Sequence, residues 1–589
     1  MSAPEVSDAG PDAGAGAEPP RPLSRRRRRI YAAVTMLFPL VVLLLVEAGL
    51  RLAGYGHSFS LFVPVDDEDP GGYLVANSQV VRRFVADPAR APKVGIRPVA
   101  FRADKEPGTF RIVVQGGSTA AGYPYGYGAS PAGMLQQRLQ RTFPERRIEV
   151  ITTALSAVNS YTLLDFSEEI LEQEPDAVVI YAGHNEYLGI LGVGSSFSAG
   201  RRRPLVLAFL ALKDVRLLQL GRRALAGVTA GAGPDPDAEG RRTLMERVVA
   251  EDRIPYGSSL YRRALAQFRA NLRALLRRYR EAGVPVFIGT LVANERDRPP
   301  FISGHRRGVD LEAWQRHFDA GVAALEADDP EAALAAFAAA AALDDLHADL
   351  HFGRGRALEA LGRYGEARAA YLAAKDRDEL RFRAPEEANA VVRDVAAAEG
   401  AHVVEVEEAF VRTADNGIVG GELMLEHLHP NLSGYFVMAD AFYDTLHEHG
   451  AIGPWRQPVS EEQALRELPV TEVDRLYGEY RIRHLTAGWP FSRESGRWQP
   501  PPARDRIERI AQGYYLGSYP WPDAMRELLD YYRRQSATAE AAKVAALIAD
   551  AYPYRADDQR TAAELLLAAG RSDHVVYRRA GELASLEPN

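Results

Sequence analysis

The sequence predicts a doubly wound α/β fold, in which helices cover both faces of a parallel sheet. From residue 108 onward, short and almost continuously apolar runs alternate with amphipathic helical patterns, which is typical of buried parallel strands joined by helices. Strands are expected at 110–115, 147–151, 177–181, 284–291 and 402–406, with helices near 131–142, 162–173, 258–282 and 384–399. Because crossovers are right-handed, a flavodoxin-like five-stranded order is the simplest topology.

Length and composition exclude several classes of protein. The 589 residues allow three to five folded units, and 47% apolar with 25% charged residues are values of a globular chain. The net charge of -8 argues against a nucleic-acid-binding protein, because such proteins carry an excess of basic residues. The absence of cysteine removes disulfides, thiolate zinc sites and thiol nucleophiles, so covalent catalysis would need another side chain.

The amino-terminal region predicts a membrane anchor. Residues 1–29 are expected to be a disordered cytoplasmic tail that ends in five consecutive arginines, and 30–50 form an apolar span that is long enough to cross a bilayer. Basic residues stay in the cytoplasm, so the juxtamembrane segment at 51–107 and all that follows is expected outside it, on the periplasmic side of a bacterial inner membrane. A cleaved signal peptide is the alternative interpretation.

Two long connections interrupt the α/β pattern. The first, 190–257, contains a candidate for an apolar helix with several arginines at 204–228. Three placements are open for this helix: packed on its own domain, over a substrate pocket, or on the membrane surface. In the second, Phe318, Gly321, Ala333 and Phe337 recur 34 residues later as Phe352, Gly355, Ala367 and Tyr371. This period resembles tetratricopeptide repeats and predicts two helix pairs at 312–380, either a protein-binding surface or a structural spacer.

The two connections define the expected division of the chain. The α/β domain comprises 108–311 and, after the helical insert, 381–457. Residues 458–589 form a helical carboxyl-terminal region in which no chemistry stands out.

Side chains suited to acyl transfer follow several of the predicted strands. Ser118 follows the first strand in Gly-Gly-Ser, Asn185 follows the third, and Glu426 and His429 come after the fifth. Carboxyl ends of parallel strands share one edge of a sheet, where such folds bind ligands. Taken singly, each has an ordinary structural explanation, as a turn, a helix cap or a loop residue.

Together these residue types meet the needs of a serine hydrolase. A serine hydroxyl becomes nucleophilic when an imidazole removes its proton, and a carboxylate fixes the tautomer of that imidazole. An amide supplies a donor for the developing oxyanion. Ser118, His429, Glu426 and Asn185 can fill those roles.

In these blocks the sequence resembles the SGNH (GDSL-type) hydrolases, over about 108–192 and 284–449 without the repeat insert. The resemblance implies that Ser118 is the nucleophile and His429 the general base. It implies an oxyanion hole made by Ser118, Ala157 and Asn185. Ala157 stands where the family has glycine, and Glu426 where it usually has aspartate.

The sequence also allows two other enzymatic interpretations. In an α/β-hydrolase the catalytic residues also occur in the order serine, acid, histidine. Its G-x-S-x-G motif around the nucleophile is lacking here, because position 120 is Ala120. Metal-dependent hydrolysis would use His184, Glu186, His427 and His429, although no H-E-x-x-H pattern is present.

The expected function is a membrane-anchored esterase outside the cytoplasm that hydrolyses carboxylic esters of a lipid or glycan through an acyl-enzyme. No cofactor is required. The same acyl-enzyme would also serve a cell-envelope O-acyltransferase that passes the group to a sugar hydroxyl. A third hypothesis is an assembly factor whose repeats bind a protein partner while its hydrolase site is vestigial.

Overall fold

A five-stranded parallel sheet forms the centre of the computed structural model, which describes residues 24–65, 72–85, 99–197, 201–229, 246, 248–492 and 498–571. Its strands are β4 (Phe110–Gly116), β5 (Ile148–Thr152), β6 (Ala177–Tyr181), β7 (Val286–Gly289) and β8 (His402–Val404). They lie in the order β5-β4-β6-β7-β8, and every neighbouring pair is parallel. The flavodoxin-like order predicted from the sequence is confirmed.

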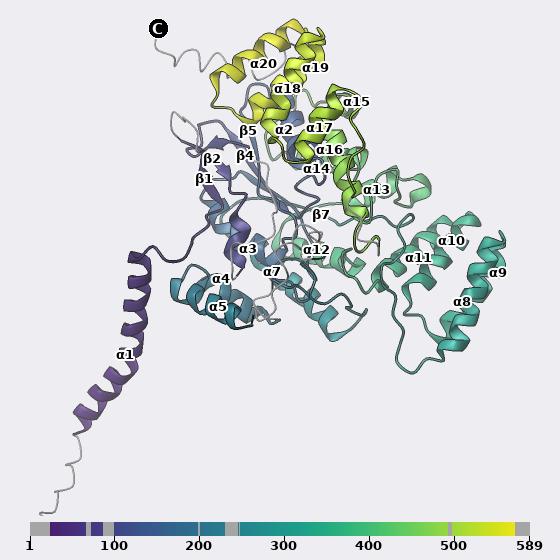
Figure 1. The fold of residues 1–589 in the computed structure, drawn as a ribbon, viewed down its shortest axis with the longest axis horizontal. Coiled ribbons are helices and arrows are strands. Elements are labelled where there is room, and N and C mark those ends of the chain that lie inside the picture. The colour runs from purple at the N-terminus through teal and green to yellow at the C-terminus, as the bar shows by residue number, and fades with distance from the viewer. Residues whose placement is uncertain are drawn as a thin grey trace, which may run out of the picture.

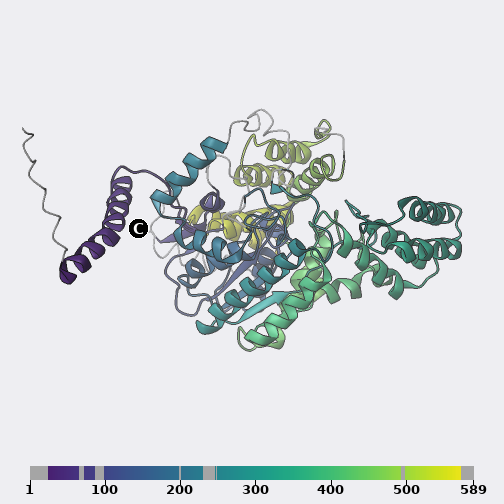
Figure 2. The same cartoon turned by 90° about the horizontal axis from the view of Figure 1, so that it is seen from below.

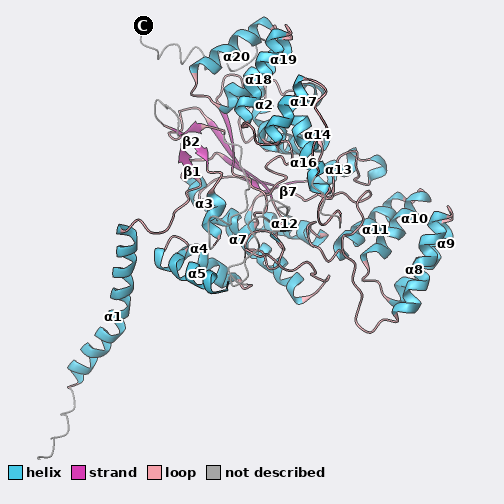
Figure 3. Cartoon of the chain, in the orientation of Figure 1, coloured by secondary structure: helices cyan, strands magenta, loops and turns pink. Residues whose placement is uncertain are grey.

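Helices cover both faces of this sheet (Figures 1 and 3). They are α2 (Pro131–Thr142), α3 (Ser160–Leu171), α7 (Ser259–Glu281), α12 (Glu386–Glu399) and α14 (Leu432–Glu448). On one face α2 packs against α14, and on the other α7 packs against both α3 and α12. All residues of β4 are buried, as a central strand covered on both faces must be.

Side-chain caps fix where three of these helices begin. Ser130 caps α2, Asn159 caps α3 in a reciprocal capping box with Thr162, and Asn431 caps α14. Each cap satisfies backbone N–H groups that the first turn leaves without a partner. The caps at 159 and 431 lie two residues after Ala157 and His429, so they also fix the loops that carry these residues.

A small antiparallel sheet lies in the segment that was expected to be a juxtamembrane connection. It contains β1 (Phe62–Pro64), β2 (Tyr73–Ala76) and β3 (Phe101–Arg102). Strands of two to four residues are too short to show a periodic pattern in a sequence. Their pairing depends on contacts between segments that are separated along the chain. Of the tail predicted at 1–29, residues 1–23 lie outside the described residues. The prediction was wrong for the five arginines, because helix α1 (Arg25–Leu52) begins at Arg25.

The helix expected at 204–228 is two helices, α4 (Arg203–Leu212) and α5 (Arg216–Thr229), so the prediction of one continuous helix was wrong. The chain turns at Lys213, whose ammonium binds Asp165 in α3 at 2.9 Å. Val206, Phe209 and Leu210 of α4 are buried on the domain. The ensuing residues 230–245 lie outside the described part of the chain.

Four helices form the second insertion and project from the α/β domain (Figure 2). They are α8 (Leu311–Glu326), α9 (Pro330–Leu343), α10 (Ala348–Ala360) and α11 (Tyr364–Arg377). The repeated positions make equivalent contacts, because the Phe337 ring lies against Gly321 and the Tyr371 ring lies against Gly355. A side chain at either glycine would collide with that ring.

The carboxyl-terminal region is helical to the end of the described chain. It contains α15 (Glu461–Arg466), α16 (Glu472–Thr486), α17 (Arg506–Tyr515), α18 (Trp521–Arg534), α19 (Thr538–Ala551) and α20 (Ala556–Ala568). Its own core includes Met525 and Leu528, which are fully buried. The region also packs on the α/β domain, where the Pro469 carbonyl lies against Gly128.

Helix α1 (Arg25–Leu52) extends away from the folded body and is the one described helix that is long and apolar enough to cross a membrane (Figure 1). None of its residues is buried. A membrane span and a signal sequence share these properties.

Candidate active site

Ser118 lies on a tight turn directly after β4. The chain reverses there, since the N–H of Ala121 donates to the Gly117 carbonyl and that of Tyr123 donates to the Ser118 carbonyl, both at 3.0 Å. At Gly116 a side chain would collide with the Tyr181 carbonyl of β6. This turn places the half-buried Ser118 above the carboxyl edge of the sheet.

His429 and Glu426 lie in a short hairpin before α14. An isolated antiparallel bridge joins Met424 to Pro430, and the N–H of Leu425 donates to the His429 carbonyl at 2.8 Å. The Asn431 cap then joins the hairpin to α14. The hairpin therefore holds both titratable side chains on a rigid support.

The Glu426 carboxylate is fully buried and fully bonded inside this hairpin. It accepts hydrogen bonds from the N–H groups of His427 at 2.6 Å, Leu428 at 3.3 Å and His429 at 3.0 Å. It also contacts Nδ1 of both imidazoles. Burial alone would raise its pKa, but attraction to His427 and His429 outweighs burial and holds the pKa of Glu426 well below its usual value.

The three side chains form a continuous line. Glu426 binds Nδ1 of His429, and Nε2 of His429 lies 2.8 Å from Oγ of Ser118. A carboxylate at Nδ1 favours the tautomer that leaves Nε2 free to accept the serine proton. The structure thus brings together Ser118 and His429, which are 311 positions apart in the sequence. The additional methylene of Glu426, compared with aspartate, does not prevent its carboxylate from binding the imidazole.

Ala157 and Asn185 also reach this edge. Ala157 has φ of 63°, a left-handed conformation that favours glycine, and it keeps the turn despite its methyl group. The amide Nδ2 of Asn185 lies so close to Gly117 that a side chain there would come within 2.9 Å. Within the described chain, the backbone N–H groups of Ser118 and Ala157 and the Asn185 amide donate to no protein acceptor. The N–H of Leu155 donates to the Gly116 carbonyl at 3.1 Å, which brings the loop that carries Ala157 to the serine turn. Three donors without an acceptor in the described chain therefore lie in the loops at this edge.

A buried carboxyl group joins the two loops that carry these donors. Glu186, next to Asn185, accepts from the N–H of Ser160 at 2.8 Å and from its hydroxyl at 2.7 Å. The Ala157 carbonyl accepts from the N–H of Ile190 at 2.7 Å. Burial raises the pKa of Glu186 to about 7 despite these hydrogen bonds.

The four residues considered as metal ligands are used differently. Glu186 binds Ser160, and His184 accepts from the N–H of Ala384 at 3.2 Å. His427 touches Glu426 but is otherwise enclosed by phenylalanine rings, among them Phe301 at 5.3 Å. Within the residues that the structure describes, no three acidic or histidine side chains are grouped to hold a metal ion.

Sequence reasoning missed the contacts that Tyr123 makes with His429, with α14 and with the carboxyl-terminal region. The Tyr123 ring lies 4.5 Å from the His429 ring, and the Arg481 guanidinium from α16 lies over Tyr123 at 4.3 Å. The Tyr435 hydroxyl from α14 donates to the Tyr123 carbonyl at 2.6 Å. An aromatic in a Gly-rich loop carries no signal for such contacts, because the partners are more than 300 residues away.

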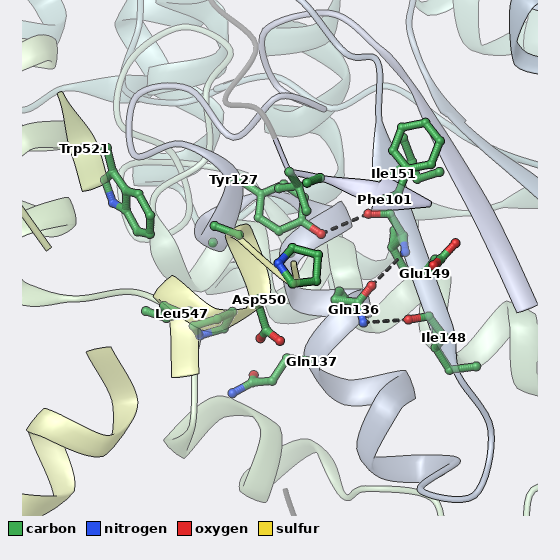
Figure 4. A pocket seen from close by; sticks show the side chains of 18 of the residues that line it. Phe101, Tyr127, Gln136, Gln137, Ile148, Glu149, Ile151, Trp521, Leu547 and Asp550 are labelled. Carbon is green, nitrogen blue, oxygen red and sulfur yellow. Dashed lines mark hydrogen bonds between the residues drawn. The ribbon is translucent and has the colours of Figure 1, made fainter. Parts of the chain in front are cut away.

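A separate pocket lies at the outer edge of the sheet, where β5 meets α2 and the carboxyl-terminal helices (Figure 4). Phe101, Tyr127, Gln136, Trp521 and Asp550 contribute to its lining. The pocket contains none of the residues predicted to act in catalysis.

Comparison with known proteins agrees with this geometry. Residues 114–354 match the model of the GDSL-like Lipase/Acylhydrolase family, a match that ends before the hairpin with His429. No curated protein matches the chain.

Several solved structures are weakly similar to this chain. An acetylxylan esterase from Geobacillus stearothermophilus is 14% identical over 59% of this chain and 97% of its own, with a TM-score of 0.26. A lipase/acylhydrolase from Enterococcus faecalis is 14% identical over 60% of this chain and 99% of its own, also with a TM-score of 0.26. A GDSL-like lipase from Bacteroides thetaiotaomicron is 11% identical over 58% and 88%, with a TM-score of 0.25. Residues 114–354 are therefore similar to the GDSL-like lipase/acylhydrolase family, and the chain is a hydrolase that acts on ester bonds.

Proposed function

We propose that this hydrolase cleaves carboxylic esters through an acyl-enzyme on Ser118. The observation that supports this most strongly is the line from Glu426 through His429 to Ser118, with 2.8 Å between the imidazole and the hydroxyl.

The proposed reaction has two halves. Ser118 Oγ attacks the ester carbonyl while His429 Nε2 takes its proton, and His429 then returns that proton to the departing alcohol. Water attacks the acyl-enzyme with His429 again as the base, which releases the carboxylic acid and restores Ser118. Glu426 stays ionised throughout and stabilises the imidazolium, in keeping with its lowered pKa.

The oxyanion of each tetrahedral intermediate would be stabilised by the N–H groups of Ser118 and Ala157 and by the Asn185 amide. This role fits three donors that bind no acceptor in the described chain and lie in loops at the same edge of the sheet as Ser118. Donors fixed before reaction stabilise developing charge without reorganising.

The proposal places the enzyme on the outer side of a bacterial inner membrane, with α1 as an uncleaved anchor. Five arginines precede the apolar residues of α1, and Glu47 is the one charged side chain between them and Leu50. The ester substrate would belong to a lipid or glycan of the envelope. The helix pairs α8–α11 would be a tetratricopeptide-like insert for a protein partner, which the equivalent Phe337 and Tyr371 contacts support.

A serine-reactive phosphonate tests the proposed nucleophile. The full chain in detergent should be labelled and inactivated, whereas Ser118→Ala should resist labelling and lose ester turnover by about 10⁴-fold or more. Ser492→Ala, a change of another described serine outside this turn, is the control. Equal labelling of the wild type and Ser118→Ala would refute the assignment.

A further inference from the structure

Helices α4 and α5 present an apolar surface that no part of the described chain covers. Among the described residues outside α1, ten large apolar side chains are exposed, and four of them lie on these two helices, namely Leu205, Leu212, Leu220 and Leu225. The remaining six are scattered over regions far apart in the sequence. Single exposed leucines are ordinary on a protein surface, but a concentration on one hairpin needs a partner.

The outward face of α4 is apolar throughout. Its exposed positions are Pro204, Leu205, Ala208, Ala211 and Leu212, spaced as one face of a helix. The opposite face is buried on the domain through Val206, Phe209 and Leu210. A surface helix of a protein in water has a polar outward face, and α4 has none.

This hairpin is attached to the end of the anchor. The Glu47 carboxylate accepts from the N–H groups of Arg216 at 3.1 Å and Leu217 at 2.9 Å, so it binds the first turn of α5. Arg51 donates to the Asp214 carbonyl at 3.1 Å. Glu47 is five residues from the end of α1, or about 7 Å along the axis. If α1 spans a bilayer, α5 must begin at its surface.

Charge complements this position. Residues 201–225 contain six arginines and one lysine against a single acid, although the whole chain has a net charge of -8. Arg202 and Arg223 are exposed beside the leucines. Leucines next to arginines on one surface are typical of helices that lie in the interface of an anionic bilayer.

We propose that α4 and α5 lie in the interfacial layer of the membrane that α1 crosses, with Leu205, Leu212, Leu220 and Leu225 inserted among anionic lipids. The inference rests on the proposed anchor. The hairpin then holds the hydrolase domain at a fixed height and orientation on the bilayer, in place of a domain that swings on a flexible stalk.

Because the chain has no cysteine, single labelled cysteines can test this directly. The full chain is placed in nanodiscs of phosphatidylcholine and phosphatidylglycerol, with an environment-sensitive fluorophore on Leu212→Cys or Leu225→Cys. Leu465→Cys on α15 is the matched control, because Leu465 is 46% exposed and Leu212 is 49% exposed. Leu40→Cys reports on the anchor. Quenchers are attached to lipids near the headgroup or near the bilayer centre.

The expected result is strong quenching of the 212 and 225 probes by the headgroup-level quencher, of the 40 probe by the central quencher, and of the 465 probe by neither. Quenching at 40 without quenching at 212 and 225 would refute the interfacial hairpin and leave the anchor intact. A blue-shifted but unquenched 212 probe would identify a protein, such as a second copy of the chain, as the partner and also refute the inference. No quenching at 40 would refute the anchor and the inference with it.

Discussion

The proposed catalytic edge of the sheet and the pocket beside β5 use polar side chains in opposite ways. At the catalytic edge, Asn185 and the backbone N–H groups of Ser118 and Ala157 donate to no acceptor in the described chain. In the pocket, Gln136 donates to the Ile148 carbonyl at 3.0 Å and accepts from the N–H of Val150 at 2.7 Å (Figure 4). One region keeps its donors available, and the other uses its side chains to complete the fold.

The difference follows from where each region lies in the sheet. β5 is an edge strand, whose outward N–H and C=O groups need partners, and side chains of α2 provide them. Gln140 adds another contact by accepting from the N–H of Ile148 at 3.0 Å. At the carboxyl ends of the strands the chain leaves the sheet in loops. No row of backbone N–H and C=O groups there needs side-chain partners. A pocket with aromatic and acidic walls is therefore a weaker sign of chemistry than unpaired donors beside a nucleophile.

The largest effect is expected at the acid of the catalytic line. Glu426→Gln should lower kcat by about 10⁴-fold, because the amide no longer favours the Nδ1–H tautomer or stabilises the imidazolium. Ester turnover by purified full-length protein measures it. Glu422→Gln is the control, since Glu422 lies in the same hairpin segment but binds Arg296 and should leave kcat nearly unchanged. A modest loss for Glu426→Gln would show that the imidazole is positioned without the acid.

A smaller loss is expected at the oxyanion donor. Asn185→Ala should lower kcat by about 10²- to 10³-fold with little change in KM, because the donor acts on charge that develops in the transition state. Gln315→Ala removes an exposed amide on α8 and should have no effect. If KM rose while kcat stayed constant, Asn185 would be a substrate-binding residue.

Glu186 should make stability depend on pH. The folded protein keeps the Glu186 proton up to about pH 7, whereas the unfolded chain loses it near pH 4.5. The unfolded state therefore binds fewer protons in this window, and the wild type loses on the order of 3 kcal/mol as pH rises through it. Glu186→Gln should remove this part of the decline in urea unfolding. A difference between wild type and variant that is constant with pH would contradict the raised pKa.

The smallest effect is expected in the pocket. Gln136→Ala leaves two backbone groups of β5 without partners and should cost about 1 to 3 kcal/mol of stability. Ester turnover of the folded variant should be unchanged, unlike that of Asn185→Ala. Gln137→Ala, which removes a bond to the Glu467 carbonyl only, should cost less. A loss of turnover in Gln136→Ala would break the distinction between the two regions.

Much of the fold could be predicted because periodicity is a local signal. The five strands of the parallel sheet were expected within a few residues of their bounds, and their order followed from handedness. The strands at Phe62–Pro64 and Phe101–Arg102 could not be expected, since two or three residues show no period. The break at Lys213 was missed because the contacts made there, such as the ion pair of Lys213 with Asp165 and the bond of Glu47 to the N–H of Arg216, join residues far apart in sequence.

The sequence by itself determined which chemical groups the site contains. Ser118, Asn185, Glu426 and His429 were identifiable because each follows a predictable strand or precedes a capped helix. Tertiary structure alone decided that the longer glutamate reaches the imidazole, that Ala157 keeps a left-handed turn, and that Arg481 packs over Tyr123. The physical reason is range: strand and helix patterns are written in neighbouring residues, whereas hydrogen bonds and burial depend on atoms that folding brings together.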